Sequence, residues 1–249
     1  MFQSTLPFGD PDLMRASVFR RYLDESARSS DAESMASRLS TLSPSLMLDL
    51  MRFEQEGRPS GVIEILAACI RHARKLLIHL QAEDRVLPLT VFPVEHLVHC
   101  PMPIRQFLAL PLGDLSVLHV EPALLRPPGD RVRTMVGEPQ HYSPLAPVLW
   151  ELALRGARAE LLPEIAGPAA YRISPGLNLR VLELSGSLAQ AVAWLKRETT
   201  NLRGVAQWPG FDNERAMRLL NGLYLQGGLM VSRTHPAAAT NDGWSHSRP

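Results

Sequence analysis

The sequence has few of the features on which secreted and membrane proteins depend. It contains only two cysteines in 249 residues, Cys69 and Cys100, whereas small secreted domains usually carry several disulfides. Its longest apolar stretches, 62–70 and 145–154, are well short of the roughly 20 residues that span a bilayer. Residues 1–10 show no basic and apolar leader. We therefore expect a cytoplasmic protein that has no membrane partner.

An excess of charge of one sign is also lacking. The chain has 26 basic and 25 acidic residues and a formal net charge of +1, so any surface that binds nucleic acid has to be local. Glycine-rich nucleotide loops of the GxxxxGK[ST] and GxGxxG types are absent, as are CxxC and HExxH elements. These absences predict no cofactor, no metal site and no catalytic residues, and they favour a protein that is not an enzyme.

What is present predicts an α+β fold, since 45% of the residues are hydrophobic and their spacing changes along the chain. Ser43 followed by Pro44 is typical of a helix start, and a second helix over 60–73 would complete a helical hairpin. Short apolar runs over 75–121 predict a small, mostly antiparallel sheet packed on that hairpin. Residues 82–85 would form a hairpin turn, and Pro88 favours an edge strand or a bulge.

The predicted organisation has five parts. A polar, partly flexible N-terminal arm over 1–40 carries Met14, Val18, Phe19 and Tyr22, which could form one helical stripe, and an α+β domain follows over 41–124. The other predicted parts are a loop-rich connecting region with one helix (125–184), a helical module (185–235) and a disordered tail (236–249).

The module over 185–235 has the clearest pattern of caps and helical spacing. Helices are expected over 187–198, 201–208 and 213–226, with Asp212 as the N-cap of the third, followed by a strand over 229–233. Three short helices followed by a strand resemble the winged-helix superfamily over about 50 residues. The third helix of such a module often enters the DNA major groove, and winged helices also bind proteins.

On the third helix, the resemblance implies four residues that contact DNA or a partner protein: Asn213, Arg215, Arg218 and Asn221. Residues 180–233 hold seven basic and four acidic side chains, a net of +3, which is little for a surface that neutralises phosphates. The leading hypothesis is therefore a non-catalytic regulatory or adaptor protein that acts by binding another protein. A DNA-binding transcription regulator is the alternative, and it requires Arg215 and Arg218 to lie exposed together rather than paired with acidic neighbours.

Two other clusters are weaker candidates. Arg71, His72, Arg74 and Lys75 could bind an anion, although cations at a helix C-terminus also interact favourably with the helix dipole. The segment 96–100, with two histidines and Cys100, is the one place where an unrecognised enzyme could have its centre. That reading requires these side chains to converge with another polar group. The partner's identity and the oligomeric state stay open.

Overall fold

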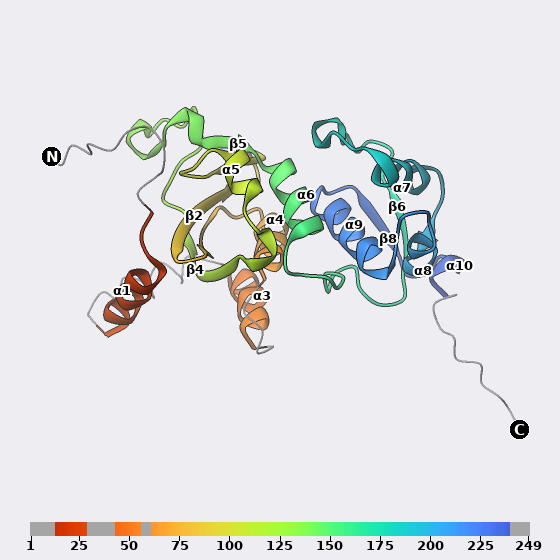
Figure 1. Ribbon diagram of the computed structural model, residues 1–249, viewed down its shortest axis with the longest axis horizontal. Coiled ribbons are helices and arrows are strands. Elements are labelled where there is room, and N and C mark those ends of the chain that lie inside the picture. The colour runs from red at the N-terminus through yellow and green to blue at the C-terminus, as the bar shows by residue number, and fades with distance from the viewer. Residues whose placement is uncertain (1–12, 29–42, 56–60, 240–249) are drawn as a thin grey trace, which may run out of the picture. The chain divides into compact units, whose positions relative to one another are not determined.

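The structure, a computed structural model, describes residues 13–28, 43–55 and 61–239. The chain divides into two units, Met1–Leu145 and Ala146–Pro249, which we call the N-terminal and C-terminal units. Both are mixtures of helices and antiparallel strands (Figure 1), so the predicted α+β class is confirmed. Residues 29–40 of the predicted N-terminal arm and most of the predicted tail lie outside the described residues.

The predicted helical hairpin is present in the N-terminal unit as α3 (Pro44–Gln55) and α4 (Val62–Arg71). The Ser43 hydroxyl accepts a hydrogen bond from the backbone N–H of Leu46 at 3.3 Å, so Ser43 caps α3 as its sequence position predicted. Helix α4 is buried over 62–69 and Leu66 is 0% exposed. The hairpin thus contributes an apolar helix to the core.

A five-stranded antiparallel sheet in the order β4-β1-β2-β3-β5 supplies the rest of this core. Alternate residues of β1 are buried, as one covered face requires. The strands are β1 (Leu76–Ala82), β2 (Arg85–Phe92), β3 (Leu97–His99), β4 (Ser116–Pro122) and β5 (Tyr142–Pro144). Between β3 and β4 lie α5 (Ile104–Ala109) and the 3-10 turn η1 (Leu112–Asp114), and η2 (Arg133–Met135) and η3 (Pro139–His141) precede β5.

The position of Pro88 corrects an expectation. Pro88 lies in β2, which pairs with β1 on one side and β3 on the other, so the strand is not at an edge. However, β3 reaches only residues 90–92 of β2. The tight turn makes Ala82 and Arg85 a hydrogen-bonded pair, and alternation then makes His79 and Pro88 a non-hydrogen-bonded pair. The Pro88 nitrogen, which has no hydrogen to donate, therefore points away from β1, in a stretch of β2 that β3 does not reach.

Helix α1 (Ala16–Arg28) lies beside β2 and β4 (Figure 1). Ala16 and Phe19 pack with Val86 in a small cluster, and Arg20 donates a hydrogen bond of 2.6 Å to Gln81. The predicted stripe is divided between two faces, because Phe19 is buried while Met14, Val18 and Tyr22 are exposed. The described part of the predicted arm is thus an ordered helix.

The C-terminal unit contains a three-stranded antiparallel sheet in the order β7-β6-β8. Its strands are β6 (Ala170–Ile173), β7 (Thr200–Asn201) and β8 (Leu229–Ser232). Its helices are α6 (Leu145–Arg155, beginning at the unit boundary), α7 (Gly186–Arg197), α8 (Leu202–Ala206), α9 (Asn213–Leu225) and α10 (Pro236–Ala239), with the 3-10 turn η4 at Arg180–Leu182.

Local signals placed the helices of this unit well. The Asp212 carboxylate accepts a hydrogen bond from the N–H of Arg215, so it caps α9 as predicted. The N-cap of α8 is Asn201, whose side chain accepts a hydrogen bond from the Gly204 N–H.

Two of the predicted parts contain elements that contact distant parts of the chain. The predicted connecting region contributes to both sheets, since β5 joins the first sheet and β6 is the middle strand of the second. The predicted disordered tail begins with α10, where Ala238 is 2% exposed and the Ala237 carbonyl accepts a hydrogen bond from the Asn201 amide. The positions of these segments depend on pairing with distant parts of the chain, which the neighbouring residues do not indicate.

Candidate functional site

The four residues predicted on α9 do not form one exposed surface. Asn213 and Arg215 are exposed, Arg218 is half-buried, and Asn221 is 0% exposed. The Asn221 side-chain oxygen accepts from the N–H of Leu162 at 2.8 Å, and its amide donates to the carbonyl of Glu160 at 2.9 Å. Asn221 therefore ties α9 to the segment after α6, and its predicted role in contacting a partner is corrected by this burial.

Arg215 ties the start of α9 to the start of α7 and to the turn that follows α8. One guanidinium nitrogen donates to the Gly210 carbonyl at 2.6 Å, and the other donates to the Ser187 hydroxyl at 2.9 Å. The guanidinium also lies 5.1 Å from the ring centre of Phe211, in cation–π geometry. Two of its five N–H donors thus bond within this chain, and the exposed remainder of the guanidinium is free to contact a partner.

Arg218 likewise forms its hydrogen bonds within this chain. Its Nε donates to the Glu214 carboxylate at 2.8 Å, one helical turn away, and another nitrogen donates to the Gly156 carbonyl at 2.7 Å. The side chain is only 16% exposed. The spacing of Glu214 and Arg218 at i and i+4 is the sequence signal that could have predicted this pair.

An aromatic cluster lies next to Arg215, made of Trp194 on α7, Trp208 after α8, and Phe211 before α9. The ring centres of Trp194 and Trp208 are 5.1 Å apart, and those of Trp208 and Phe211 are 6.5 Å apart with the rings at 90°. All three side chains are half-buried. The cluster thus leaves part of its aromatic surface at the solvent, at the turn that joins α8 to α9.

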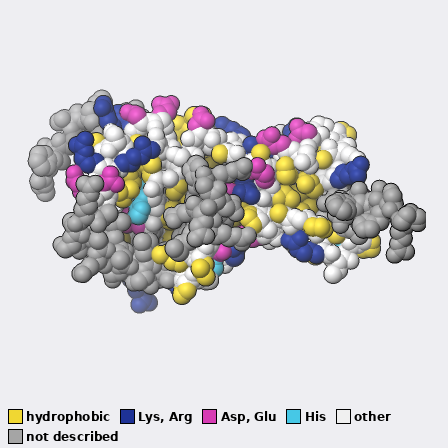
Figure 2. All heavy atoms as spheres, turned by 90° about the horizontal axis from the view of Figure 1, so that it is seen from below, with side chains coloured by type: hydrophobic (Ala, Val, Ile, Leu, Met, Phe, Trp, Pro, Cys, Tyr) yellow, Lys and Arg dark blue, Asp and Glu magenta, His cyan; other side chains and the backbone are white. Residues whose placement is uncertain are grey.

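On one face of this unit, charged side chains are interspersed rather than gathered. On the face drawn in Figure 2, hydrophobic side chains of the C-terminal unit form a group with basic and acidic side chains around it. Proteins that bind duplex DNA through its phosphates present several free cations together. The requirement that Arg215 and Arg218 lie exposed as a pair is not met, because Arg218 is bonded to Glu214.

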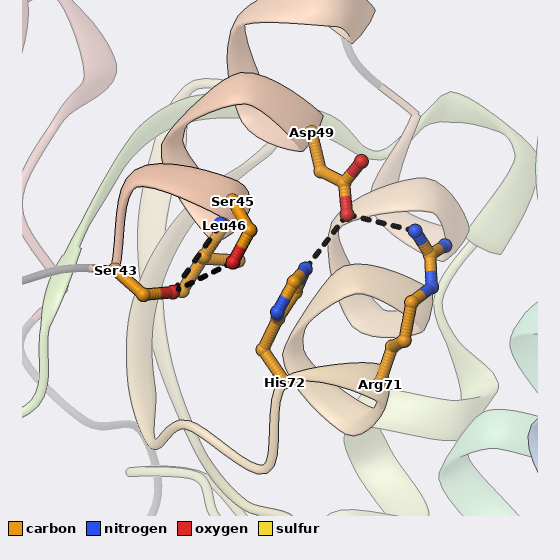
Figure 3. A network of polar contacts seen from close by, with 6 residues as sticks. All are labelled: Ser43, Ser45, Leu46, Asp49, Arg71 and His72. Atoms are coloured by element: carbon orange, nitrogen blue, oxygen red, sulfur yellow. Dashed lines mark hydrogen bonds and ion pairs between the residues drawn. The ribbon is translucent and has the colours of Figure 1, made fainter.

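The basic cluster at the end of α4 is partly neutralised by an acidic side chain of α3. Figure 3 shows the carboxylate of Asp49 between Arg71 and His72, and each donates to Oδ2 at 2.7 Å. The Asp49 side chain is 23% exposed. This contact joins the two helices of the hairpin and uses two of the four residues that were predicted to bind an anion.

The other two basic residues of that cluster lie apart. Arg74 is exposed, and the Lys75 ammonium is 3.5 Å from the carbonyl of Leu125. Burial, and secondarily the nearby Arg126, lower the pKa of Lys75. The four residues consequently do not converge on a common point where an anion could bind.

Residues 96–100 do not assemble a catalytic centre. His96 is exposed in the turn before β3 with a φ of 55°, whereas Cys100 is 1% exposed. His99 contacts His141 and Tyr142, with ring centres 5.7 and 4.9 Å away. Burial raises the pKa of the Cys100 thiol to about 11, so the thiolate needed for nucleophilic attack is scarce at neutral pH. His96, His99 and Cys100 therefore do not converge as the enzyme hypothesis requires.

Residues 13–28, 43–55 and 61–239 contain no group of three or more histidine, cysteine or acidic side chains placed to hold a metal ion. Over the same described ranges, every helix is too short or too polar to cross a membrane. Comparison of the sequence with protein-family models, and of the chain with curated proteins and with solved structures, gives no match.

Proposed function

We propose that this chain is a non-catalytic regulatory or adaptor protein that acts through protein–protein interaction. Its C-terminal winged-helix-like module would carry the binding surface. The observation that supports this is the half-exposed aromatic cluster of Trp194, Trp208 and Phe211 beside Arg215. Tryptophan and arginine are the residues most enriched among those that dominate protein–protein binding energy.

The arrangement of the module is consistent with the resemblance on which the proposal draws. Helices α7, α8 and α9 and strand β8 follow one another in the expected order. Strand β8 pairs with β6. Since β6 precedes α7 in the sequence, the strand that pairs with β8 comes from the segment before the module. A third helix whose cations bond within the chain suits a module that binds protein better than one that reads DNA.

The competing role as a transcription regulator is tested by fluorescence anisotropy of a labelled mixed-sequence duplex, titrated with the full chain across a salt series. We expect no saturable binding even at low salt, because Arg218 bonds to Glu214 and Gly156 and Arg215 bonds to Gly210 and Ser187. An Arg215→Glu variant should behave as the wild type does. Tight binding that weakens steeply with salt, and that Arg215→Glu abolishes, would overturn the proposal in favour of DNA.

A further inference from the structure

The C-terminal unit has a second feature, separate from the aromatic cluster, which is an open hollow beside α7. Its volume is about 690 Å³, within the range of small-molecule sites. The segment between β6 and α7 forms one wall, and α7 contributes Val192 and Lys196 to the other. The apolar part of its lining consists of Leu177, Leu179, Leu184 and Val192.

The segment that forms this wall is held in place by hydrogen bonds. Ser174 donates its N–H to the Gly228 carbonyl at 2.8 Å, and Asn178 accepts the N–H of Arg180 at 3.1 Å. Leu177 lies so close to Gly228 that a Cβ there would collide with it. The hollow is therefore preformed, which lowers the entropy cost of binding a ligand.

Backbone strain occurs at the same place. Glu183, which lines the hollow, has φ 47° and ψ 47°, a left-handed conformation that side-chain-bearing residues adopt at a cost. Strained residues of this kind cluster at ligand-binding sites, where the surrounding structure maintains them. The left-handed residue thus lies in the wall of the hollow.

The charges of the lining favour a ligand with a single negative charge. Among the described residues, Arg180 and Lys196 pair with no acidic side chain, although both line the hollow. With Glu183 also in the lining, the two cations and one carboxylate leave a net charge of +1. A single negative charge balances this, whereas a dianionic phosphate would also be repelled by Glu183. The planar guanidinium of arginine suits a carboxylate, which it can bind with two parallel hydrogen bonds.

We infer that this hollow binds a small monocarboxylate with an apolar body. The carboxylate is held between Arg180 and Lys196, and the apolar body lies on Leu177, Leu184 and Val192. This assignment goes beyond the proposed function, because it gives the C-terminal unit a small-molecule ligand in addition to a protein partner. It uses none of the residues of the aromatic cluster, so either proposal can fail without the other.

The test follows backbone amide chemical shifts of the isotopically labelled full chain during titration with decanoate. We expect saturable shifts confined to residues 176–184 and the amides of Val192 and Lys196. The double variant Arg180→Glu/Lys196→Glu should weaken binding at least tenfold, and Arg180→Gln/Lys196→Gln should weaken it less. Arg197→Glu is the matched control, because Arg197 is an exposed cation of the same helix outside the hollow, and it should change affinity less than twofold.

Two further probes test separately whether the ligand must be charged and whether the charged group must be a carboxylate. Decanol, which has the same chain without the charge, should bind at least tenfold more weakly than decanoate, and octyl phosphate should also bind more weakly than octanoate. The inference is overturned if decanoate leaves these amides unshifted, if decanol binds equally well, or if the double glutamate variant retains wild-type affinity. Tighter binding of the phosphate ester would also overturn it.

Discussion

Replacing Asn221 with alanine is expected to lower the free energy of unfolding of the C-terminal unit by about 3 kcal/mol. The variant removes a side chain that is 0% exposed and whose two polar atoms bond to Leu162 and Glu160. The buried N–H of Leu162 would lose its acceptor, the Glu160 carbonyl would lose this donor, and a cavity would remain. Each of these effects destabilises the folded state.

The measurement is denaturant unfolding followed by tryptophan fluorescence, because all four tryptophans of the sequence lie at or after residue 150 and so report on this unit. Asn213→Ala is the matched control, since Asn213 is an exposed asparagine on the same helix, and it should change stability by less than about 0.5 kcal/mol. Equal stability of the two variants would contradict the structural role assigned to Asn221.

The N-terminal unit is expected to lose stability as the pH falls from about 6.5 to about 4. Burial, and secondarily His119, lower the pKa of His79 to about 4, so in this window the unfolded chain takes up a proton that the folded chain does not. The sign follows from linkage, because the state that binds more protons is favoured by acid. The His79 ring is partly solvated, so we expect a loss of about 1–2 kcal/mol rather than the ~3 kcal/mol of a fully buried group.

Two variants identify His79 as the source of this dependence. His79→Phe keeps an aromatic ring against Phe19, whose ring centre is 4.6 Å away, but it cannot take up a proton. Phe19→Ala uncovers the ring and should bring its pKa nearer to the ordinary value. Amide hydrogen exchange of β1 and β2 at pH 7 and pH 4.5 should show a smaller pH effect in both variants. An unchanged effect in His79→Phe would assign the dependence to other groups.

Features encoded by neighbouring residues could be predicted from the sequence. Ser43 and Asp212 were identified as helix caps and residues 82–85 as a turn, and hydrogen bonds confirm the caps while the register of β1 and β2 confirms the turn. Each of these contacts spans three residues, so composition and spacing within a few positions determine them.

Features that depend on distant residues were missed. Asn221 was predicted to contact a partner because of its position on the third helix, but its hydrogen-bond partners precede it by about 60 residues. The aromatic cluster brings together Trp194, Trp208 and Phe211 from separate elements, and in the sequence the tryptophans are simply scattered. Asp49 likewise gave no signal, because its bonds to Arg71 and His72 form only when α3 packs on α4.

Affinity capture on the immobilised full chain tests the central proposal most directly, comparing the wild type with Phe211→Ser in extract from the native host. Loss of an interface residue that carries about 2 kcal/mol corresponds to roughly 30-fold weaker binding. Met230→Ser is the control, because Met230 is an exposed apolar residue of the same unit, 53% accessible, outside the cluster. We predict a protein that the wild type and Met230→Ser capture equally and that Phe211→Ser loses. Equal capture by all three chains, or no captured protein with the wild type, would contradict the account.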